Sequence, residues 1–597
     1  HEQEAGQLYS DIAITVSASI IASMLFALFV VPAACAFFGL ASTPHKDYNR
    51  GHMMRVIRWL NSGMKRRLSV LLVSIVSTLG LAIAFMPAAE YLPEGEEPKA
   101  FSMMFAPAGY SLNEMAEIGE SVKLKLNDAL DASPEDYQPG EGQIPALEYY
   151  LQMISGGRIF VLSEPKDHTQ IDPMMDELTE LFTTYPGMRA FSSRGSIISS
   201  NQGGTRTVVL NVSGPDQQAL FTTAQNIMNR AKDVFDNPRL NSEPSSLSLD
   251  QPLIQILPKW QRLAELDMTA ESFGISVAAF SDGAFVGEFI DGDKKIDMFL
   301  FNQVEGEKSI EKLSQIPIRA PNGDILPLAS LADIRETVAS EDIRRIEGRR
   351  TVSVFLIPPP HVALETAIQK VRTELIPQLR AQGEIPPKVS VSISGAADQL
   401  DATQQALFKN FLVAAVLIYL LLVVILSHWT YPTLILTTVP LGIAGGVVGL
   451  VMVNLFGDLM TQAGLPGFFQ AFDMITMLGF VILLGTVVNN PILIVCQARS
   501  NLATGNLSIQ EAVNSAVAQR LKPIIMSTVT TVCGLAPLVF IPGAGTELYR
   551  GVGIVVMMGI LFSVLITLAF LPCLLVVWFQ IQQRFKTKRP GTATQPQ

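Results

Sequence analysis

Cysteine and metal-binding motifs are scarce in this sequence. The chain of 597 residues has four cysteines, and the polar stretch 89–409 has none, which excludes a disulfide framework and a thiolate zinc site there. The six histidines are scattered without the spacing of metal ligands. No phosphate loop, nucleophile elbow or zinc-binding helix motif is present. We therefore expect neither an enzyme nor a bound metal or cofactor.

Charged residues are also few. They make up 16% of the chain, whereas 49% of its residues are hydrophobic, a balance too apolar for an ordinary soluble protein. The formal net charge of −11 gives no support for nucleic-acid binding, which requires a basic face. The composition predicts a membrane protein.

Seven apolar runs reach the length of about 20 residues that a helix needs to cross a bilayer. The connection between the first two runs is rich in lysine and arginine, and the positive-inside rule places such connections in the cytoplasm. By the same rule the loop 498–521 and the tail are cytoplasmic, which leaves residues 89–409 outside. The runs cover residues 11–39, 68–88, 410–427, 432–456, 473–497, 522–541 and 551–579.

Two adjacent amides, Asn489 and Asn490, interrupt the fifth run and are followed by Pro491. An unpaired amide in hydrocarbon is costly, and Pro491 frees a backbone carbonyl one turn back. The pair acts either as hydrogen-bond glue between helices or as part of a transport pathway. No Asp or Glu lies in the interior of any run, so this chain alone cannot carry protons through the middle of the membrane.

Other small and polar residues in the runs have ordinary structural explanations. Four glycines in the fourth run allow close helix packing, and hydroxyls in the sixth run bond back to their own helix or meet the asparagine pair. Ser508-Ile-Gln-Glu511 predicts a capped cytoplasmic helix that ends at Arg520, just before Pro523 opens the sixth run. These glycines and hydroxyls are Gly442, Gly445, Gly446, Gly449, Ser527, Thr528, Thr530 and Thr531.

The first run matches the last one when it is shifted by 540 positions. The pairs Leu8/Leu548, Tyr9/Tyr549 and Pro32/Pro572 are the strongest evidence for this match, because apolar residues coincide by chance in any two membrane helices. We predict a duplicated chain in which the first run closes a first repeat whose other helices are missing, while the second repeat is complete.

The outer region, residues 89–409, contains repeated strand–helix units. Alternating strands are predicted at Phe101–Ala106, Thr207–Ser213 and Thr351–Ile357, each followed by a helix, and Ser111-Leu-Asn-Glu114 forms a capping box before the first helix. Such units form small split βαβ layers. Residues 250–340 differ. The sequence predicts a hairpin there through Asp291-Gly-Asp293, and these residues form either an inserted module or more of the same domain.

Several long motifs occur in fixed order along the chain. They are YLPEGEEPKAFSMMFAPAGYSL at 91–112, AFVGEFIDGDKKIDMFL at 284–300, GTVVNNPILIV at 485–495, RLKPIIMST at 520–528, GLAPLVF at 534–540 and LYRGVGIVVMMG at 548–559. With these motifs the chain resembles the inner-membrane pumps of the resistance–nodulation–division (RND) superfamily. The resemblance is strongest to the C-terminal half, from the sixth to the twelfth helix, of permeases of the hydrophobe/amphiphile efflux type.

The resemblance implies a polytopic α-helical membrane bundle, with seven spans present of twelve, and a large periplasmic α+β region of ferredoxin-like βαβ subdomains. The implied division is 1–88, two membrane helices with a basic cytoplasmic loop; 89–249, porter subdomains; 250–340, an inserted docking or funnel module; 341–409, completion of the porter; 410–579, a five-helix membrane bundle; and 580–597, a cytoplasmic tail.

The resemblance also implies roles for individual residues. In the family, paired aspartates on the fourth helix couple protonation to extrusion, and that helix is not in this chain. Where many members have a lysine on the tenth helix, this chain has Asn489, which implies hydrogen bonding in place of charge pairing. Asn489, Asn490, Arg520 and Ser527 are thus the candidates for proton coupling. Phe160 is the candidate for substrate binding.

The expected function is the C-terminal portion of a proton-driven multidrug or amphiphile exporter in the bacterial inner membrane, with residues 89–409 in the periplasm. The expected partners are the missing N-terminal half, two further copies in a homotrimer, a periplasmic adaptor, an outer-membrane channel and a small amphiphilic substrate. Two alternatives remain. A heavy-metal exporter would need a ladder of Met or Cys through the porter, and a lipid-handling or scaffold subunit would not transport.

Overall fold

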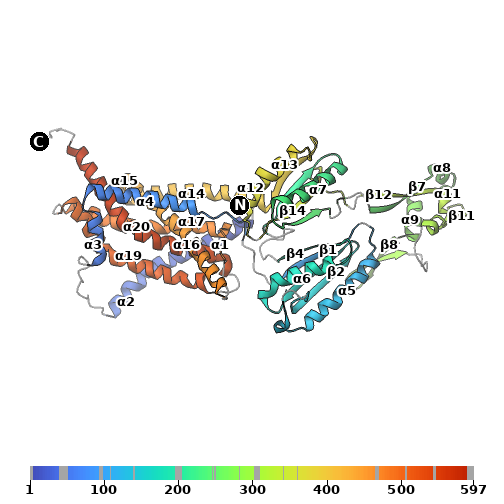
Figure 1. Ribbon diagram of the computed structural model, residues 1–597, viewed down its shortest axis with the longest axis horizontal. Coiled ribbons are helices and arrows are strands. Elements are labelled where there is room, and N and C mark those ends of the chain that lie inside the picture. Colours follow the sequence, from blue (N-terminus) through green and yellow to red (C-terminus); the bar gives the residue numbers. More distant parts are fainter. Residues whose placement is uncertain are drawn as a thin grey trace.

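The computed structural model is long, with a helical bundle at one end and two sheets and a small distal module towards the other (Figure 1). The residues it describes are 4–38, 51–92, 99–107, 109–138, 142–194, 205–244, 247, 251–281, 283–300, 310–339, 342–359, 361–463, 469–504, 507–541 and 546–587.

Seven spans of the described chain are helical, long and apolar enough to cross a membrane, as the sequence predicted. The first, Ile12–Phe37, has no buried residue, whereas most of the fourth and of the seventh is buried. In chain order the helices are α1 (Glu4–Leu25) with η1 (Phe26–Val30) and α2 (Val31–Phe37), α4 (Met64–Phe85), α14 (Ala396–Leu426), α15 (Thr430–Leu436) with α16 (Val439–Gln462), α17 (Met474–Val487) with α18 (Asn489–Ala503), α19 (Ile509–Phe540) and α20 (Thr546–Thr587).

Helix α19 corrects one expectation. The cytoplasmic helix was expected to end at Arg520, but α19 runs without interruption from Ile509 to Phe540, with Pro523 inside it. Proline removes one backbone hydrogen bond, and the other bonds of this 32-residue helix continue past the gap. The predicted capping box is present, because the Ser508 side chain accepts from the Glu511 N–H and Glu511 accepts from the Ser508 N–H.

The glycines of α16 bring its backbone against α20. A Cβ added at Gly445 would lie 2.4 Å from Phe562 Cβ, and one added at Gly449 would lie 2.4 Å from Met558 Cβ. Both distances are far shorter than a carbon–carbon contact. The close helix packing predicted from these glycines is therefore confirmed.

Two antiparallel sheets, one of four strands and one of five, contain the same β-α-β-β-α-β order. The first has the strand order β2-β3-β1-β4, and Met104, Ile159 and Met174 lie in its buried core under two helices. The predicted capping box at Ser111 and Glu114 opens the first of these helices. The elements are β1 (Ala100–Phe105), α5 (Leu112–Asp131), η3 (Pro134–Asp136), β2 (Leu147–Ser155), β3 (Arg158–Pro165), η4 (His168–Gln170), α6 (Ile171–Thr183) and β4 (Arg189–Arg194).

In the second layer the central strands are β14 and β5, with β6 and β15 outside them and a short β13 also pairing with β14. Strand β15 leads directly into membrane helix α14 through Gly395, whose φ of +80° favours glycine. The elements are β5 (Val208–Ser213), α7 (Gln217–Val234), β6 (Arg239–Glu243), β13 (Arg345–Ile346), β14 (Arg349–Ile357), α12 (Leu364–Lys370), η5 (Val371–Leu375), α13 (Ile376–Ala381) and β15 (Ser390–Gly395).

A long antiparallel ribbon, β7 (Gln251–Pro258) with β12 (Ala332–Ala339), leads to the distal module (Figure 1). The module packs around a core of its own that includes Leu263, Phe273 and Leu331. A hairpin through Asp291-Gly-Asp293 is present, as predicted. The remaining elements are α8 (Trp260–Glu265), α9 (Ala270–Phe280), β8 (Ala284–Asp291), β9 (Lys294–Leu300), α10 (Ile310–Ser314), β10 (Pro317–Arg319), β11 (Ile325–Pro327) and α11 (Leu328–Leu331).

Candidate functional site

The asparagine pair lies where a membrane helix is broken. Helix α17 ends at Val487, Val488 is a turn, and α18 begins at Asn489. The sequence did not predict this interruption; its physical reason is that Pro491 leaves a backbone carbonyl one turn back without a donor. Asn489 is exposed and Asn490 is half-buried. Across the described residues, neither side chain makes a hydrogen bond with a side chain of α19 or with each other, so the described contacts give the pair no role as interhelical glue.

Arg520 and Ser527 lie on α19, and in the described chain neither side chain makes a hydrogen bond to the asparagine pair. Arg520 donates from Nη2 to Gln497 Oε1 on α18 at 2.8 Å, while its Nε is buried with no partner among the described residues. Ser527 Oγ donates to the Ile524 carbonyl at 3.0 Å. Its neighbours Thr528, Thr530 and Thr531 also bond back to their own helix, which is one of the two arrangements expected for these hydroxyls.

Phe160 lies in the middle of the open face of the first sheet. The register places Met103 directly opposite it on β1 and Met153 directly opposite it on β2, and its ring stacks on Phe101 with centroids 6.0 Å apart. Met153 is 59% exposed and Leu151 on the same face is 48% exposed. The other face of the sheet is covered by helices, so the open face is an apolar, aromatic and thioether-rich surface.

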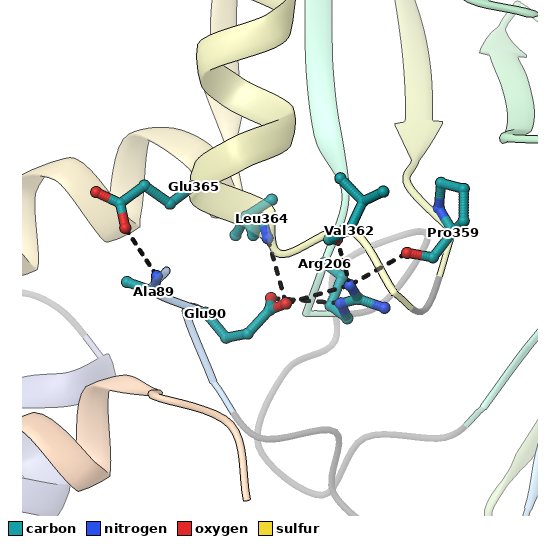
Figure 2. A network of polar contacts seen from close by, with 7 residues as sticks. All are labelled: Ala89, Glu90, Arg206, Pro359, Val362, Leu364 and Glu365. Atoms are coloured by element: carbon teal, nitrogen blue, oxygen red, sulfur yellow. Dashed lines mark hydrogen bonds and ion pairs between the residues drawn. The ribbon is translucent and has the colours of Figure 1, made fainter. Parts of the chain in front are cut away.

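A polar junction joins the membrane bundle to the second sheet layer, and the sequence did not indicate it. After α4 the chain runs through Ala89 and Glu90. This short segment forms hydrogen bonds to two different parts of the chain. On one side Glu90 N donates to the Phe472 carbonyl at 3.0 Å, just before α17. On the other, Glu365 N donates to the Ala89 carbonyl at 3.1 Å, and Ala89 N donates back to Glu365 Oε2 at 2.7 Å (Figure 2).

A buried ion pair completes this junction. Arg206 Nη2 lies 3.1 Å from Glu90 Oε1, and the two side chains are only 10% and 12% exposed. The same guanidinium donates to the Val362 carbonyl at 2.7 Å, and Glu90 Oε1 accepts from the Leu364 N–H at 3.2 Å (Figure 2). The pair therefore ties the chain after α4 to the start of α12 and to the segment that leads into β5, with the additional hydrogen bonds that a buried pair needs.

Asp473, next to this junction, is fully buried. It caps α17, lying one residue before that helix, and accepts at Oδ1 from the Thr476 N–H at 2.7 Å and at Oδ2 from Gln470 Nε2 at 3.2 Å. Burial raises the pKa of Asp473 to about 7, and the Glu90 carboxylate adds to the increase, whereas the hydrogen bonds from Thr476 lower it. A group with this pKa exchanges protons near neutral pH.

Gln470 connects the Asp473 cap to helix α16. Asn454 of α16 accepts from the Gln470 N–H at 2.8 Å and donates to the Gln470 carbonyl at 3.0 Å. Helix α20 also packs directly against this cap, because a Cβ added at its Gly551 would clash with Thr476 Oγ1. A change of charge at Asp473 would therefore act on α16, α17 and α20 together.

The chain is similar to several curated proteins, and it spans about half the length of each of the three described here. It is 23% identical over 600 residues to the swarming motility protein SwrC of Bacillus subtilis, covering 99% of this chain and 53% of the relative. It is 22% identical over 617 residues to the multidrug/solvent efflux pump transporter MepB of Pseudomonas putida, covering 99% and 55%. It is also 23% identical over 587 residues to the cobalt-zinc-cadmium resistance protein CzcA of Cupriavidus metallidurans, covering 95% and 53%.

A solved structure shows the same fold. The crystal structure of a heavy metal efflux pump matches with a TM-score of 0.73 at 19% identity, over 96% of this chain and 56% of that one. The model of the AcrB/AcrD/AcrF family matches residues 3–578. The motif resemblance is thereby confirmed, and the chain belongs to the AcrB/AcrD/AcrF family of RND permeases.

Proposed function

We propose that the chain forms the porter and half of the membrane bundle of a proton-driven exporter of amphiphilic compounds, and that it is not an enzyme. The open face around Phe160 carries this proposal, because a broad apolar and aromatic surface with few charges suits amphiphilic molecules of varied shape. In this proposal the two β-α-β-β-α-β layers are ferredoxin-like porter subdomains in the periplasm, and the bundle lies in the inner membrane with the other helices of a twelve-span protein.

Replacing Phe160 with alanine is expected to weaken the binding of a fluorescent cationic amphiphile about tenfold, because a stacked aromatic ring contributes on the order of 1.5 kcal/mol. Binding is measured by fluorescence polarisation on the purified protein produced from its own gene. Trp260→Ala is the matched control, since Trp260 is a 61% exposed aromatic residue in the distal module, and it should leave binding unchanged. Equal binding by Phe160→Ala and wild type would rule out this face.

Heavy-metal export is the second candidate, and the observation in its favour is the thioether on each side of Phe160. Met103 and Met153 lie opposite it in the sheet. Against it, no group of three or more His, Cys, Asp or Glu that could hold a metal ion occurs in the described part of the chain. If a Met103→Leu and Met153→Leu double variant loses zinc or cobalt resistance while amphiphile binding persists, metal is the cargo.

For energy coupling, we propose that the exposed polar face of α18 and α19 meets membrane helices that carry carboxylates. Asn489, Ser527 and Thr530 are all exposed on the described bundle, and polar side chains are costly towards lipid. Because this chain has amides where a lysine is common, hydrogen bonding would replace charge pairing in the coupling.

Asn490→Ala is expected to lower proton-coupled export at least tenfold in the protein expressed from its own gene, with no change in the amount of protein in the membrane. The reason is that an alanine cannot hydrogen-bond a carboxyl group when it gains or loses its proton. Export is followed by dye release from cells, and proton flux by a pH-sensitive dye in proteoliposomes. If both remain at the wild-type level, the asparagine pair serves packing only.

The same proposal includes assembly into a homotrimer that works with a periplasmic adaptor and an outer-membrane channel. The β8–β9 hairpin supports it, because this hairpin exposes a set of large apolar side chains, which is unusual for a surface that stays in water. These side chains are Phe285, Val286, Phe289, Ile290, Ile296, Met298, Phe299 and Leu300.

A further inference from the structure

Helix α3 (His52–Leu60) connects to α4 at the end of the bundle far from the sheets (Figure 1). It is strongly two-sided. Met54 and Ile57 are buried against the bundle, whereas Trp59 is 58% exposed and Val56 is 53% exposed. At about 100° per residue, the exposed apolar flank formed by Val56 and Trp59 lies roughly opposite Met54 and Ile57. The helix therefore packs on protein along one side and offers apolar groups along the other.

The connection between α3 and α4, residues 61–63, is the elbow that holds α3 in a fixed position. Asn61 Nδ2 donates to Asn514 Oδ1 of α19 at 2.9 Å. Arg67 is 4% exposed and donates to the Asn61 carbonyl at 2.9 Å, to Gln580 of α20 at 3.2 Å and to Gln510 of α19 at 3.0 Å. The orientation of α3 is thus set by the bundle before any partner arrives.

Bases without acids surround the exposed flank. Residues 51–85 contain five Lys or Arg and no Asp or Glu. Four of these bases, Arg55, Arg58, Lys65 and Arg66, are exposed. The Arg66 guanidinium lies 4.8 Å from the centre of the Trp59 ring. An indole beside a guanidinium is suited to the boundary between acyl chains and headgroups, where one part is apolar and the other wet.

We propose that α3 and the first turn of α4 form a docking surface for anionic phospholipid headgroups of the cytoplasmic leaflet. The exposed Trp59 and Val56 enter the outer part of the acyl region, and Arg55, Lys65 and Arg66 bind the headgroup phosphates. Charge complementarity selects this occupant, since a run with only positive charges repels basic surfaces, and an apolar flank at the end of a membrane helix is already at the depth of the headgroups.

This proposal goes beyond membrane orientation. The positive-inside rule accounts for the side of the membrane on which the bases lie, but it does not require an exposed tryptophan beside them or an elbow that fixes their direction. It is also independent of the exporter proposal, because lipid contact at α3 does not depend on what the porter face binds.

The test uses the purified protein from its own gene in phosphatidylcholine nanodiscs that contain the same mole fraction of brominated phosphatidylglycerol or brominated phosphatidylcholine. The Trp59 signal is the difference between wild type and Trp59→Phe. Bromine on phosphatidylglycerol is expected to quench this signal much more strongly than bromine on phosphatidylcholine. Each base removed should lower the enrichment about fivefold, so that the R55Q/K65Q/R66Q variant shows equal quenching by the two lipids.

Two further variants separate lipid binding from loss of fold. R55K/R66K keeps the charges and should keep the preference for phosphatidylglycerol. K522Q removes an exposed base from α19, away from α3, and should also keep it. Equal quenching of wild type by both lipids, or a preference that survives R55Q/K65Q/R66Q, would overturn the proposal, and so would an equal loss in K522Q.

Discussion

Glu90→Gln is expected to destabilise the protein by about 3–5 kcal/mol, the typical cost of removing one partner of a buried ion pair. The Arg206 guanidinium would lose the Glu90 carboxylate, and the carbonyls of Pro359 and Val362 that also accept from it carry no net charge. We expect a clearly lower melting midpoint of the purified protein. Arg206→Gln should have a similar effect, because it leaves the Glu90 carboxylate in the same poorly solvated position.

The E90L/R206M double variant tests whether the charges themselves are responsible. Replacing both partners with apolar groups of similar size removes both desolvation costs, so the double variant should be more stable than either single variant. Glu288→Gln is a matched control: Glu288 forms an ion pair with Lys295 at 2.8 Å in which both side chains are exposed, and exposed pairs contribute little. If E90Q melts like E288Q, the junction does not depend on the ion pair.

Gly445→Ala is expected to cost about 1–3 kcal/mol, the usual penalty for overpacking a tight interior. The added Cβ would lie 2.4 Å from Phe562 Cβ and 3.1 Å from the Met558 carbonyl oxygen. A change of side-chain rotamer moves neither of these two neighbouring atoms, so it cannot relieve the clash. Helices α16 and α20 would have to separate. The melting midpoint and the yield of monodisperse protein should both fall.

Gly534→Ala provides the opposite case within the same bundle. Nothing lies within 4 Å of a Cβ added there, and alanine favours a helix over glycine by about 1 kcal/mol. Its melting midpoint should equal or exceed that of the wild type. If Gly445→Ala and Gly534→Ala behaved alike, close approach of α16 and α20 would not limit the stability of the bundle.

Much of the fold could be predicted because it is encoded locally. The seven spans follow from apolar length, and the caps at Ser111 and Ser508 follow from a hydroxyl followed three residues later by a glutamate. Helix α17 ends one turn before Pro491, whereas Pro523 lies inside an unbroken helix. Each of these two prolines removes one backbone hydrogen bond of its helix. The packing around the helix then decides whether the other backbone hydrogen bonds continue past it.

The polar junction could not be predicted, because its residues are distant in the sequence. Glu90 and Arg206 are separated by 116 positions, and no local pattern links an acid after a membrane helix to a base before a strand. Asp473 did carry a signal, since an aspartate three residues before a threonine at the start of an apolar run is a helix N-cap pattern. Motifs in the sequence indicated Asn489, Arg520 and Phe160 as candidates. The residues that surround each of them could be identified only from the structure.

Helix α14 has a length that the membrane alone does not require. Its 31 residues extend about 46 Å, and about 20 residues suffice for the hydrocarbon, so roughly 16 Å of the helix reaches into the second sheet layer, where Ala397, Leu400 and Leu407 are buried. A rigid rod of this kind acts as a lever: a tilt of about 10° in the membrane moves its outer end by about 3 Å. Because Gly395 joins that end directly to β15, and β15 pairs with β5 along its whole length, the tilt would shift the strand that follows Arg206.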